Sequence, residues 1–474
     1  MENLRSAFIA LLTGIVILAF VHTSCTSSVG RGMEAVFITD KLYTDPPNFG
    51  SYPATKDQIQ KMIDEVDLPN IRAHAWDVWG SITSPGPEGL PVWETWYSGY
   101  EVFELAGKKG IKTRNIVRDF QSPKQFHHFE NVIGGAIPQD LPEQITSFNR
   151  YTKSVADFIV SSGLNRTEVL DSINGSFDQA GTPIALRQIQ TTPDSIDERA
   201  IVLKPVFQFI DGSGPTVIPF WNGISPKTTT DLKNPEPHTW RQGVIVDPTG
   251  VLKPGDSALM SVNNEPPRWL QVVGLEDFYA IELTEEDVKE FSDFAATSGD
   301  DVGKGNMTDS TSIYQNVKVG NYALLMAMHV TSKEINNWTW QTFWWSPYND
   351  HPFFGADRPT SILAPWDHYN MRTAYFMVTP AGSAAGEPFV SFNPYLETNL
   401  FGTVPIKTKN GVLDSIPWTG VNSNCMTCHR LAARAPGNFN TPAYQPDGFI
   451  DIGDSVFAGM TKVDFLWSVA IRPQ

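Results

Sequence analysis

The sequence predicts an α+β protein, with helices first, a β-rich middle and a loop- and helix-containing carboxy-terminal region that carries a cysteine motif. Three observations predict this class. Amphipathic helical patterns occur before residue 200, short apolar β-branched segments follow, and loop-rich sequence begins near residue 385. We therefore divide the chain into a leader (1–25), a polar linker (26–45), a mainly helical Trp-rich region (46–200), a β-rich region (201–385) and a carboxy-terminal region (386–474).

The amino-terminal segment has the pattern of an export leader. Arg5 precedes an apolar run at 8–21, which has the length of a signal-peptide core and is short for a membrane span. Cys25 lies among small polar residues, as at a bacterial lipoprotein cleavage site, although His22 stands where leucine is usual. We expect an exported protein, periplasmic or at the outer membrane or cell surface, attached to a membrane if Cys25 is acylated. Simple secretion and an uncleaved anchor helix are the alternatives.

The secondary-structure signals follow local rules. Helices are indicated by apolar residues at a period of 3.6 and by capping residues, including Thr55 and the pair Thr284/Asp287. Strands are indicated by apolar, β-branched runs between Pro and Gly turns. The predicted helices are 55–66, 142–162 (ended by Gly163) and 284–296, and the predicted strands are 200–210, 242–248, 269–283, 321–330 and 373–380.

The net charge and the number of cysteines limit which partners and cofactors the sequence predicts. The 474-residue chain has a net charge of −17 and no basic stripe, so we expect no nucleic-acid partner. It has three cysteines, and if Cys25 is lipidated or removed, Cys425 and Cys428 remain. The oligomeric state stays open.

The remaining two cysteines form a distinctive motif, NCMTCHR at 424–430. C-x-x-C-H is the attachment signature of c-type haem. Each thiol adds to one haem vinyl group, and the following histidine reaches the iron as the proximal ligand. The motif therefore predicts one covalent haem c on Cys425, Cys428 and His429. A thioredoxin-type disulfide, a structural zinc site and a chance motif are the alternatives.

A helix would give this motif the required geometry. Ser423 or Asn424 can cap it, "CMTCHRLAARA" favours helix, and Pro436-Gly437 ends it. On such a helix the two thiols and the imidazole share one face. Arg430 and Arg434 would lie one turn apart and could pair with the haem propionates, or could form a solvated helix face.

Several longer strings carry a family resemblance. The segments "RAHAWDVW", "PVWETWY", "MHVTSKEINNWTWQTFWW", "NPYLETN", "NCMTCHRLA" and "TKVDFLWSVA" together resemble a family of exported bacterial proteins loosely called cytochrome c family proteins. The resemblance covers most of the chain after the leader. It implies one covalent haem held by Cys425, Cys428 and His429 and a location outside the cytoplasm, but no substrate. Fewer than about fifty residues follow the motif, so upstream segments must supply walls of the haem pocket.

Aromatic residues at 338–345 are the first candidates for such a wall. In a strand, Trp338, Trp340 and Trp344 would face one way, and Phe343 and Trp345 the other. The segment is either a buried core strand or, on one face, a wall of the haem crevice that excludes water and raises the reduction potential.

The sixth iron ligand has two side-chain candidates. Met460 lies about thirty residues after His429 and offers a soft thioether, or else fills a gap beside Phe457 and Phe465. His329, in an apolar strand, is the weaker candidate. An open or water-filled position is the third possibility.

Other local motifs predict little chemistry. We interpret the acidic, Gly-rich segment 298–306 as a surface loop and His127-His128 as exposed loop residues, and 211–214 matches no nucleophile or phosphate motif. The leading function is therefore electron transfer, or a redox subunit with a protein redox partner. Alternatives are a haem enzyme with an open iron site for peroxide, oxygen or a small nitrogen compound, and a surface binding protein with a structural haem.

Overall fold

A computed structural model of the chain has the mixed α+β fold that the sequence predicts. The structure describes residues 41–108, 116–120, 145–193, 199–221, 240–263, 265–297, 317–348, 350–352, 354–377, 391–397, 402–407, 413–418, 424–436 and 450–474. The predicted leader with Cys25, the pair His127-His128 and the segment 298–306 lie outside these residues. Within them, no helix is long and apolar enough to cross a membrane.

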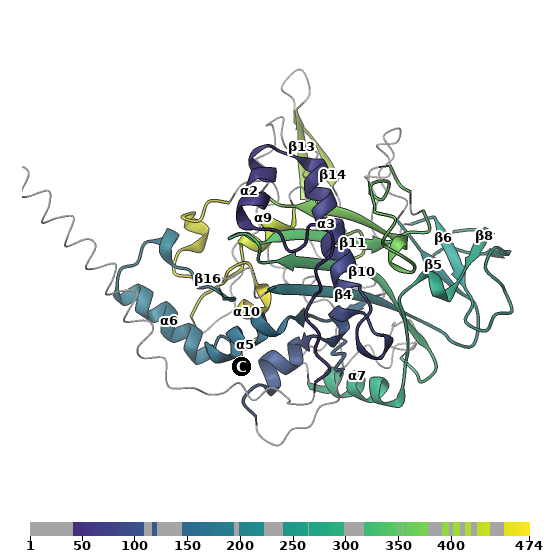
Figure 1. Cartoon of the computed structure of the whole chain (residues 1–474), viewed down its shortest axis with the longest axis horizontal. Helices are drawn as coiled ribbons and strands as arrows, with labels where there is room; N and C mark the ends of the chain where they lie inside the picture. Colours follow the sequence, from purple (N-terminus) through teal and green to yellow (C-terminus); the bar gives the residue numbers. More distant parts are fainter. Residues whose placement is uncertain are drawn as a thin grey trace, which may run out of the picture.

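An antiparallel sheet of eight strands forms the centre of the molecule (Figure 1). Its main path runs β1-β3-β4-β10-β11-β12, while β2 pairs with β4 and β9 pairs with β10. Both faces of the long strands are largely covered, which explains their near-continuous apolar sequences. The strands are β1 (Tyr97–Ser98), β2 (Thr146–Ser147), β3 (Arg150–Tyr151), β4 (Ile201–Ile210), β9 (Ala280–Glu282), β10 (Tyr322–Ser332), β11 (Thr339–Trp345) and β12 (Tyr369–Ala374).

Three smaller sheets accompany the central one. A four-stranded sheet has the order β5-β6-β8-β7, and β13-β14 and β15-β16 are two-stranded antiparallel sheets. Their strands are β5 (Thr216–Pro219), β6 (Gly243–Val246), β7 (Ser257–Met260), β8 (Arg268–Val273), β13 (Gly402–Lys407), β14 (Leu413–Trp418), β15 (Ala433–Arg434) and β16 (Thr461–Lys462).

The helices confirm two of the three predicted segments in full. Helix α2 (Lys56–Asp64) has the Thr55 capping box, and α7 (Glu285–Thr297) follows the Thr284/Asp287 pair. The helix predicted over 142–162 is only half right, because Thr146–Ser147 and Arg150–Tyr151 pair with β4 and helix α5 begins at Lys153. Pairing with β4 therefore overrides the helical periodicity of that sequence. The other helices are α3 (Leu68–Ile82), α6 (Thr167–Gln179), α9 (Cys425–Arg430) and α10 (Trp467–Ile471).

The predicted strands 200–210, 242–248 and 321–330 are confirmed as β4, β6 and β10. The single strand predicted over 269–283 is wrong in part, because a turn at Leu275–Asp277 divides it into β8 of the four-stranded sheet and β9 of the central sheet. The strand predicted over 373–380 is displaced within the described residues, because β12 is Tyr369–Ala374; residues 378–380 lie outside the described ranges. Its register pairs Trp345 with Tyr369 and Trp340 with Ala374, so β12 ends where its partner strand begins.

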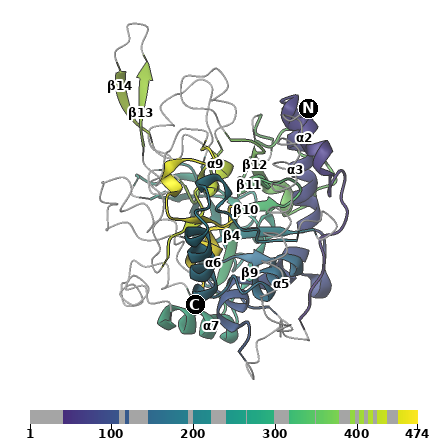
Figure 2. The ribbon, with the colours of Figure 1, turned by 90° about the vertical axis from the view of Figure 1, so that its left-hand side faces the viewer.

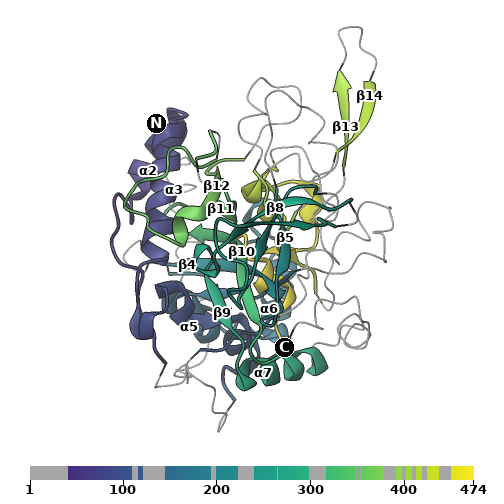
Figure 3. The same ribbon diagram turned by 90° about the vertical axis from the view of Figure 1, so that its right-hand side faces the viewer.

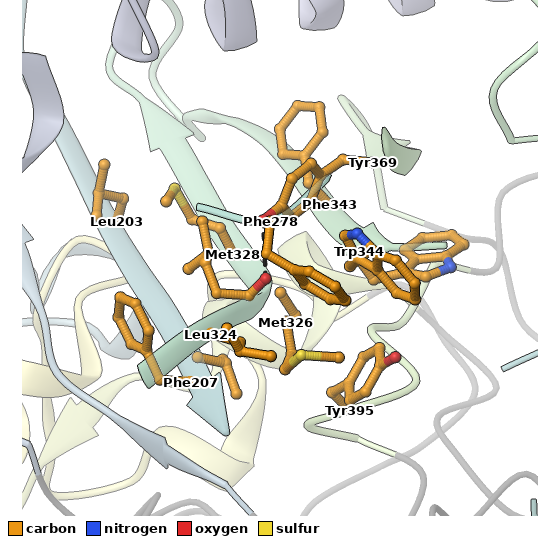
Figure 4. Close-up of a cluster of buried hydrophobic side chains, with 14 of the residues drawn as sticks. Leu203, Phe207, Phe278, Leu324, Met326, Met328, Phe343, Trp344, Tyr369 and Tyr395 are labelled. Atoms are coloured by element: carbon orange, nitrogen blue, oxygen red, sulfur yellow. Dashed lines mark hydrogen bonds between the residues drawn. The ribbon is translucent and has the colours of Figure 1, made fainter. Parts of the chain in front are cut away.

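Helices cover both faces of the central sheet. Figures 2 and 3 show α2 and α3 on one side of β10–β12 and the carboxy-terminal segment with α9 on the other. On the α3 face, Trp79 stacks on Phe343 with 4.1 Å between ring centroids. The largest hydrophobic cluster includes this stack, and Figure 4 shows part of the cluster, including Leu203, Phe207, Met328 and Phe343.

The second hydrophobic cluster lies on the α9 face and includes residues of the predicted helical, β-rich and carboxy-terminal regions. It joins residues of α5, the sheet and the carboxy-terminal region, among them Val155, Ile159, Val202, Trp340, Cys425, Phe465 and Val469. The cysteine motif is thus built into the core by upstream segments.

Candidate haem-binding site

The cysteine motif forms the short helix α9, which Asn424 fixes at its amino-terminal end. The Asn424 side-chain oxygen accepts a hydrogen bond from the Thr427 amide at 3.1 Å, and its amide group donates to the Phe376 carbonyl at 2.9 Å. Asn424 is therefore the predicted cap. The helix is shorter than expected and ends at Arg430, because Ala433–Arg434 pair with Thr461–Lys462 in a small sheet.

The two cysteines are separate thiols in a desolvated setting. Cys425 is buried, with its Sγ 3.9 Å from the Ser391 hydroxyl, and Cys428 is partly accessible. Burial raises the pKa of both thiols, that of Cys428 to about 12, and the Glu397 carboxylate acts in the same direction. A redox-active C-x-x-C pair needs a lowered thiol pKa. The pKa of both thiols is raised instead, so the structure does not support a redox-active disulfide of the thioredoxin type.

His429 is held in one tautomer. Its Nδ1 lies 2.8 Å from the Phe465 carbonyl oxygen, which can only accept, so Nδ1 carries the proton. Burial lowers the pKa of His429 to about 4, and the neighbouring His329 acts in the same direction. The imidazole is therefore neutral, with its lone pair on Nε2. This is the arrangement found in metal-binding histidines, in which a second-shell carbonyl orients the ring.

Trp340 packs directly against the His429 imidazole. The two ring centroids are 4.2 Å apart, and the Trp340 indole donates to the Asn337 carbonyl at 2.9 Å. Trp340 is 3% exposed. The predicted alternation of β11 is confirmed for Trp340 and Trp344 against Phe343 and Trp345 (Figure 4 labels Phe343 and Trp344). Trp338 lies before the strand at a φ of 62° but joins the same cluster as Trp340.

A row of polar side chains crosses the sheet next to Trp340. His329 on β10 pairs with Lys204 on β4 and with Thr342 on β11, and Thr342 pairs with Arg372 on β12. Directly paired residues point to the same face of a sheet, and Thr342 shares its face with Trp340. The polar row therefore lies on the α9 face of the sheet, one step along the strands from Trp340.

The segment 391–397 connects this polar row with the cysteine motif. Ser391 contacts Cys425, and Asn393 donates to the Thr342 hydroxyl at 2.7 Å and to the Phe343 carbonyl at 3.0 Å. At the end of the segment, Glu397 Oε1 lies 3.2 Å from His329 Nε2. The other carboxylate oxygen accepts a hydrogen bond from the backbone N–H of Asn393. One segment thus carries polar groups from the motif to His329.

The arginines predicted to meet haem propionates have other partners. Arg434 donates to the Ala470 carbonyl at 2.8 Å and to Thr167 at 3.3 Å, so it joins α10 to α6. The Arg430 guanidinium lies over the Phe465 ring, 5.3 Å from its centroid. The helix that would have put both arginines one turn apart ends between them.

The two candidate sixth ligands lie in different surroundings. Met460 packs in a small cluster with Leu431, Ala433, Ile450 and Phe457, separate from the cluster that contains Cys425 and Trp340. This is the gap-filling environment named as its alternative role. His329 lies on β10 opposite Thr342 of β11, and its charge contributes to the lowered pKa of His429.

Sequence reasoning missed the polar groups that surround His329. Lys204 interrupts the apolar run "AIVLKPVF", and burial lowers its pKa to about 7, opposed by Glu397. Burial also lowers the pKa of Arg372, to about 10. A lysine within an apolar strand is a visible signal, whereas Glu397 has none, because only the folded chain brings it to the motif.

The described residues contain no ready-made cluster of three His, Cys, Asp or Glu side chains for a metal ion. The zinc alternative therefore gains no further ligands from them. Comparisons with models of known protein families, with curated proteins and with solved structures give no match.

Proposed function

We propose that this chain is an exported c-type haem protein in which Cys425 and Cys428 hold one haem covalently and His429 Nε2 binds its iron. The observation that carries the proposal is the hydrogen bond from His429 Nδ1 to the Phe465 carbonyl. It leaves the lone pair on Nε2, on the same helix as two free thiols at the attachment spacing.

The accessibility of the motif fits such a group. Cys428 and His429 keep part of their surface accessible, yet desolvation is the largest cause of their pKa shifts. Lys204 and Arg372 on the facing sheet combine the same two properties. A haem attached to α9 would therefore meet partly accessible groups on α9 and on the facing sheet.

The surrounding side chains would prepare the site for redox chemistry. Bound haem supplies one-electron exchange at iron. Trp340 and the Phe465 segment exclude water beside His429, which disfavours the more charged ferric state and raises the reduction potential. We therefore infer a role in electron transfer, or as a redox subunit, with a protein redox partner outside the cytoplasm. The leader predicted at 1–25 and an acylated Cys25 would provide export and attachment.

A haem enzyme is the second candidate, and one observation favours it. The polar row with His329 and Lys204, together with Glu397, is an unusual content for the face of a core sheet. A pure electron carrier needs no acid–base groups beside the motif helix.

The optical spectrum of the purified holoprotein tests the proposal and separates the two candidates. Ferric and ferrous spectra should convert reversibly with one electron. A low-spin spectrum that does not change when carbon monoxide is added supports electron transfer. A high-spin spectrum that changes on binding of carbon monoxide supports a haem enzyme. Protein made with a c-type maturation system that carries no haem would overturn both.

A further inference from the structure

We infer that Glu397, oriented by His329, accepts and returns the proton of a small protic ligand that binds beside the cysteine-motif helix. The inference rests on the proposed function and deepens it, since it names the ligand class and the residue that handles the proton. It favours the enzyme candidate over the pure carrier.

The Glu397 carboxylate is fixed in place by two contacts. One oxygen lies 3.2 Å from His329 Nε2, and the other accepts a hydrogen bond from the backbone N–H of Asn393. The side chains of His329 and Glu397 are 18% and 17% exposed, respectively. They are therefore oriented and shielded, but a molecule the size of water or peroxide can still touch them.

The charge of Glu397 reaches every member of the motif. Among the described carboxylates, it is the one that contributes to the pKa of Cys425, of Cys428 and of His429 alike. It also raises the pKa of Lys204 against the effect of burial. The geometry agrees, because segment 391–397 contacts Cys425 through Ser391 and His329 through Glu397.

A merely structural role explains the pair less well. Segment 391–397 is already anchored by Asn393, which donates to the Thr342 hydroxyl and to the Phe343 carbonyl. Keeping a lysine, a histidine and an arginine in one partly shielded row of the sheet costs desolvation energy. Such costly polar groups cluster at functional sites more often than in structural cores.

The contact between His329 and Glu397 also argues against His329 as the sixth iron ligand. Nε2 is the outermost nitrogen of the imidazole, and it faces Glu397 Oε1. The ring is therefore engaged with a carboxylate of this chain. The remaining position would be left for a ligand from solution.

The chemistry needs only a proton transfer. A protic ligand HX gives its proton to the Glu397 carboxylate and stays in the site as X⁻. The His329 imidazole, with its Nε2 3.2 Å from Glu397 Oε1, holds Glu397 in the orientation that accepts the proton, and Arg372 contributes positive charge to the same face. When the ligand leaves, the proton returns from Glu397, so charge and atoms balance.

Cyanide binding to the ferric holoprotein tests this inference without turnover, because hydrogen cyanide must lose its proton to bind as an anion. Glu397→Gln should slow cyanide association about 100-fold, the usual size of a general-base contribution. His329→Gln should slow it less. Carbon monoxide, which carries no proton, should bind the ferrous forms of all variants at similar rates. Glu282→Gln, which removes an exposed carboxylate from β9 of the same sheet, is the matched control and should behave like wild type.

Two results would overturn the inference while covalent haem persists. One is wild-type cyanide kinetics in Glu397→Gln. The other is a low-spin wild type that binds neither probe until His329→Gln opens the site, which would make His329 the ligand. Protein without covalent haem would overturn the proposed function as well, so the two failures are distinguishable.

Discussion

Removing the indole of Trp340 should lower both the stability of the protein and the reduction potential of its haem. Trp340 is 3% exposed, and its ring lies 4.2 Å from that of His429. Replacing a buried Trp by Ala costs about 3–5 kcal/mol in unfolding free energy, through lost burial and the cavity left behind. Trp340→Phe keeps a ring there and loses the hydrogen bond to Asn337, so its cost should be about 1–2 kcal/mol.

The functional part of the prediction needs a control with the same packing loss. Trp344 lies on the same face of β11 but packs against Trp221 and Phe354, away from His429. Trp344→Ala should therefore destabilise by a similar amount and leave the potential unchanged. Trp340→Ala should admit water beside His429 and lower the potential, since water favours the ferric form.

Two measurements on the holoprotein decide this prediction. Urea unfolding gives the free energies, and optical redox titration gives the potentials. Equal potentials in Trp340→Ala and Trp344→Ala would refute the view that Trp340 forms a wall of the haem site, whatever their stabilities.

Three further predictions concern Lys204, Met460 and the leader. Burial lowers the pKa of Lys204 from 10.5 to about 7 in the folded protein, so the unfolded chain binds this proton more strongly between those pH values. Lys204→Met should therefore raise the free energy of unfolding by up to about 4 kcal/mol at pH 7 and below, and this gain should fade toward pH 10.5. A gain in urea unfolding that does not depend on pH would contradict this prediction. Met460→Ala should cost about 2 kcal/mol and leave the ferric spectrum unchanged, whereas loss of a long-wavelength ferric band would identify Met460 as a ligand after all. Mass spectrometry of the mature protein should show an acylated Cys25 at its amino terminus; a free terminus beyond Cys25 would leave simple secretion, and a chain that begins at Met1 would exclude cleavage.

Local sequence rules succeed where the structure is decided locally. The capping pairs at Thr55 and at Thr284/Asp287 are satisfied within one turn, and both helices form where predicted. The same rules fail where distant strands compete. Residues 146–151 have a helical period, but β4 pairs with them, and α9 ends early because Ala433–Arg434 find β16.

The candidate site shows the same division. Cys425, Cys428 and His429 are adjacent in sequence and could be recognised from their spacing alone. Lys204, His329 and Glu397 are separated by more than a hundred residues or by a long segment, and only the register of β4 and β10 and the course of segment 391–397 bring them together. A pattern in one sequence carries no information about that register.

Intact-mass spectrometry of the denatured protein tests the central claim most directly. Protein made with a c-type maturation system should exceed its apoprotein mass by one haem and should keep that haem after denaturation. Cys425→Ala and Cys428→Ala should each weaken or abolish the attachment, while Thr427→Ser, which keeps the hydroxyl that bonds Asn424 in the same helix, should retain it. A wild-type chain at its apoprotein mass, or full attachment in the double cysteine variant, would contradict the account.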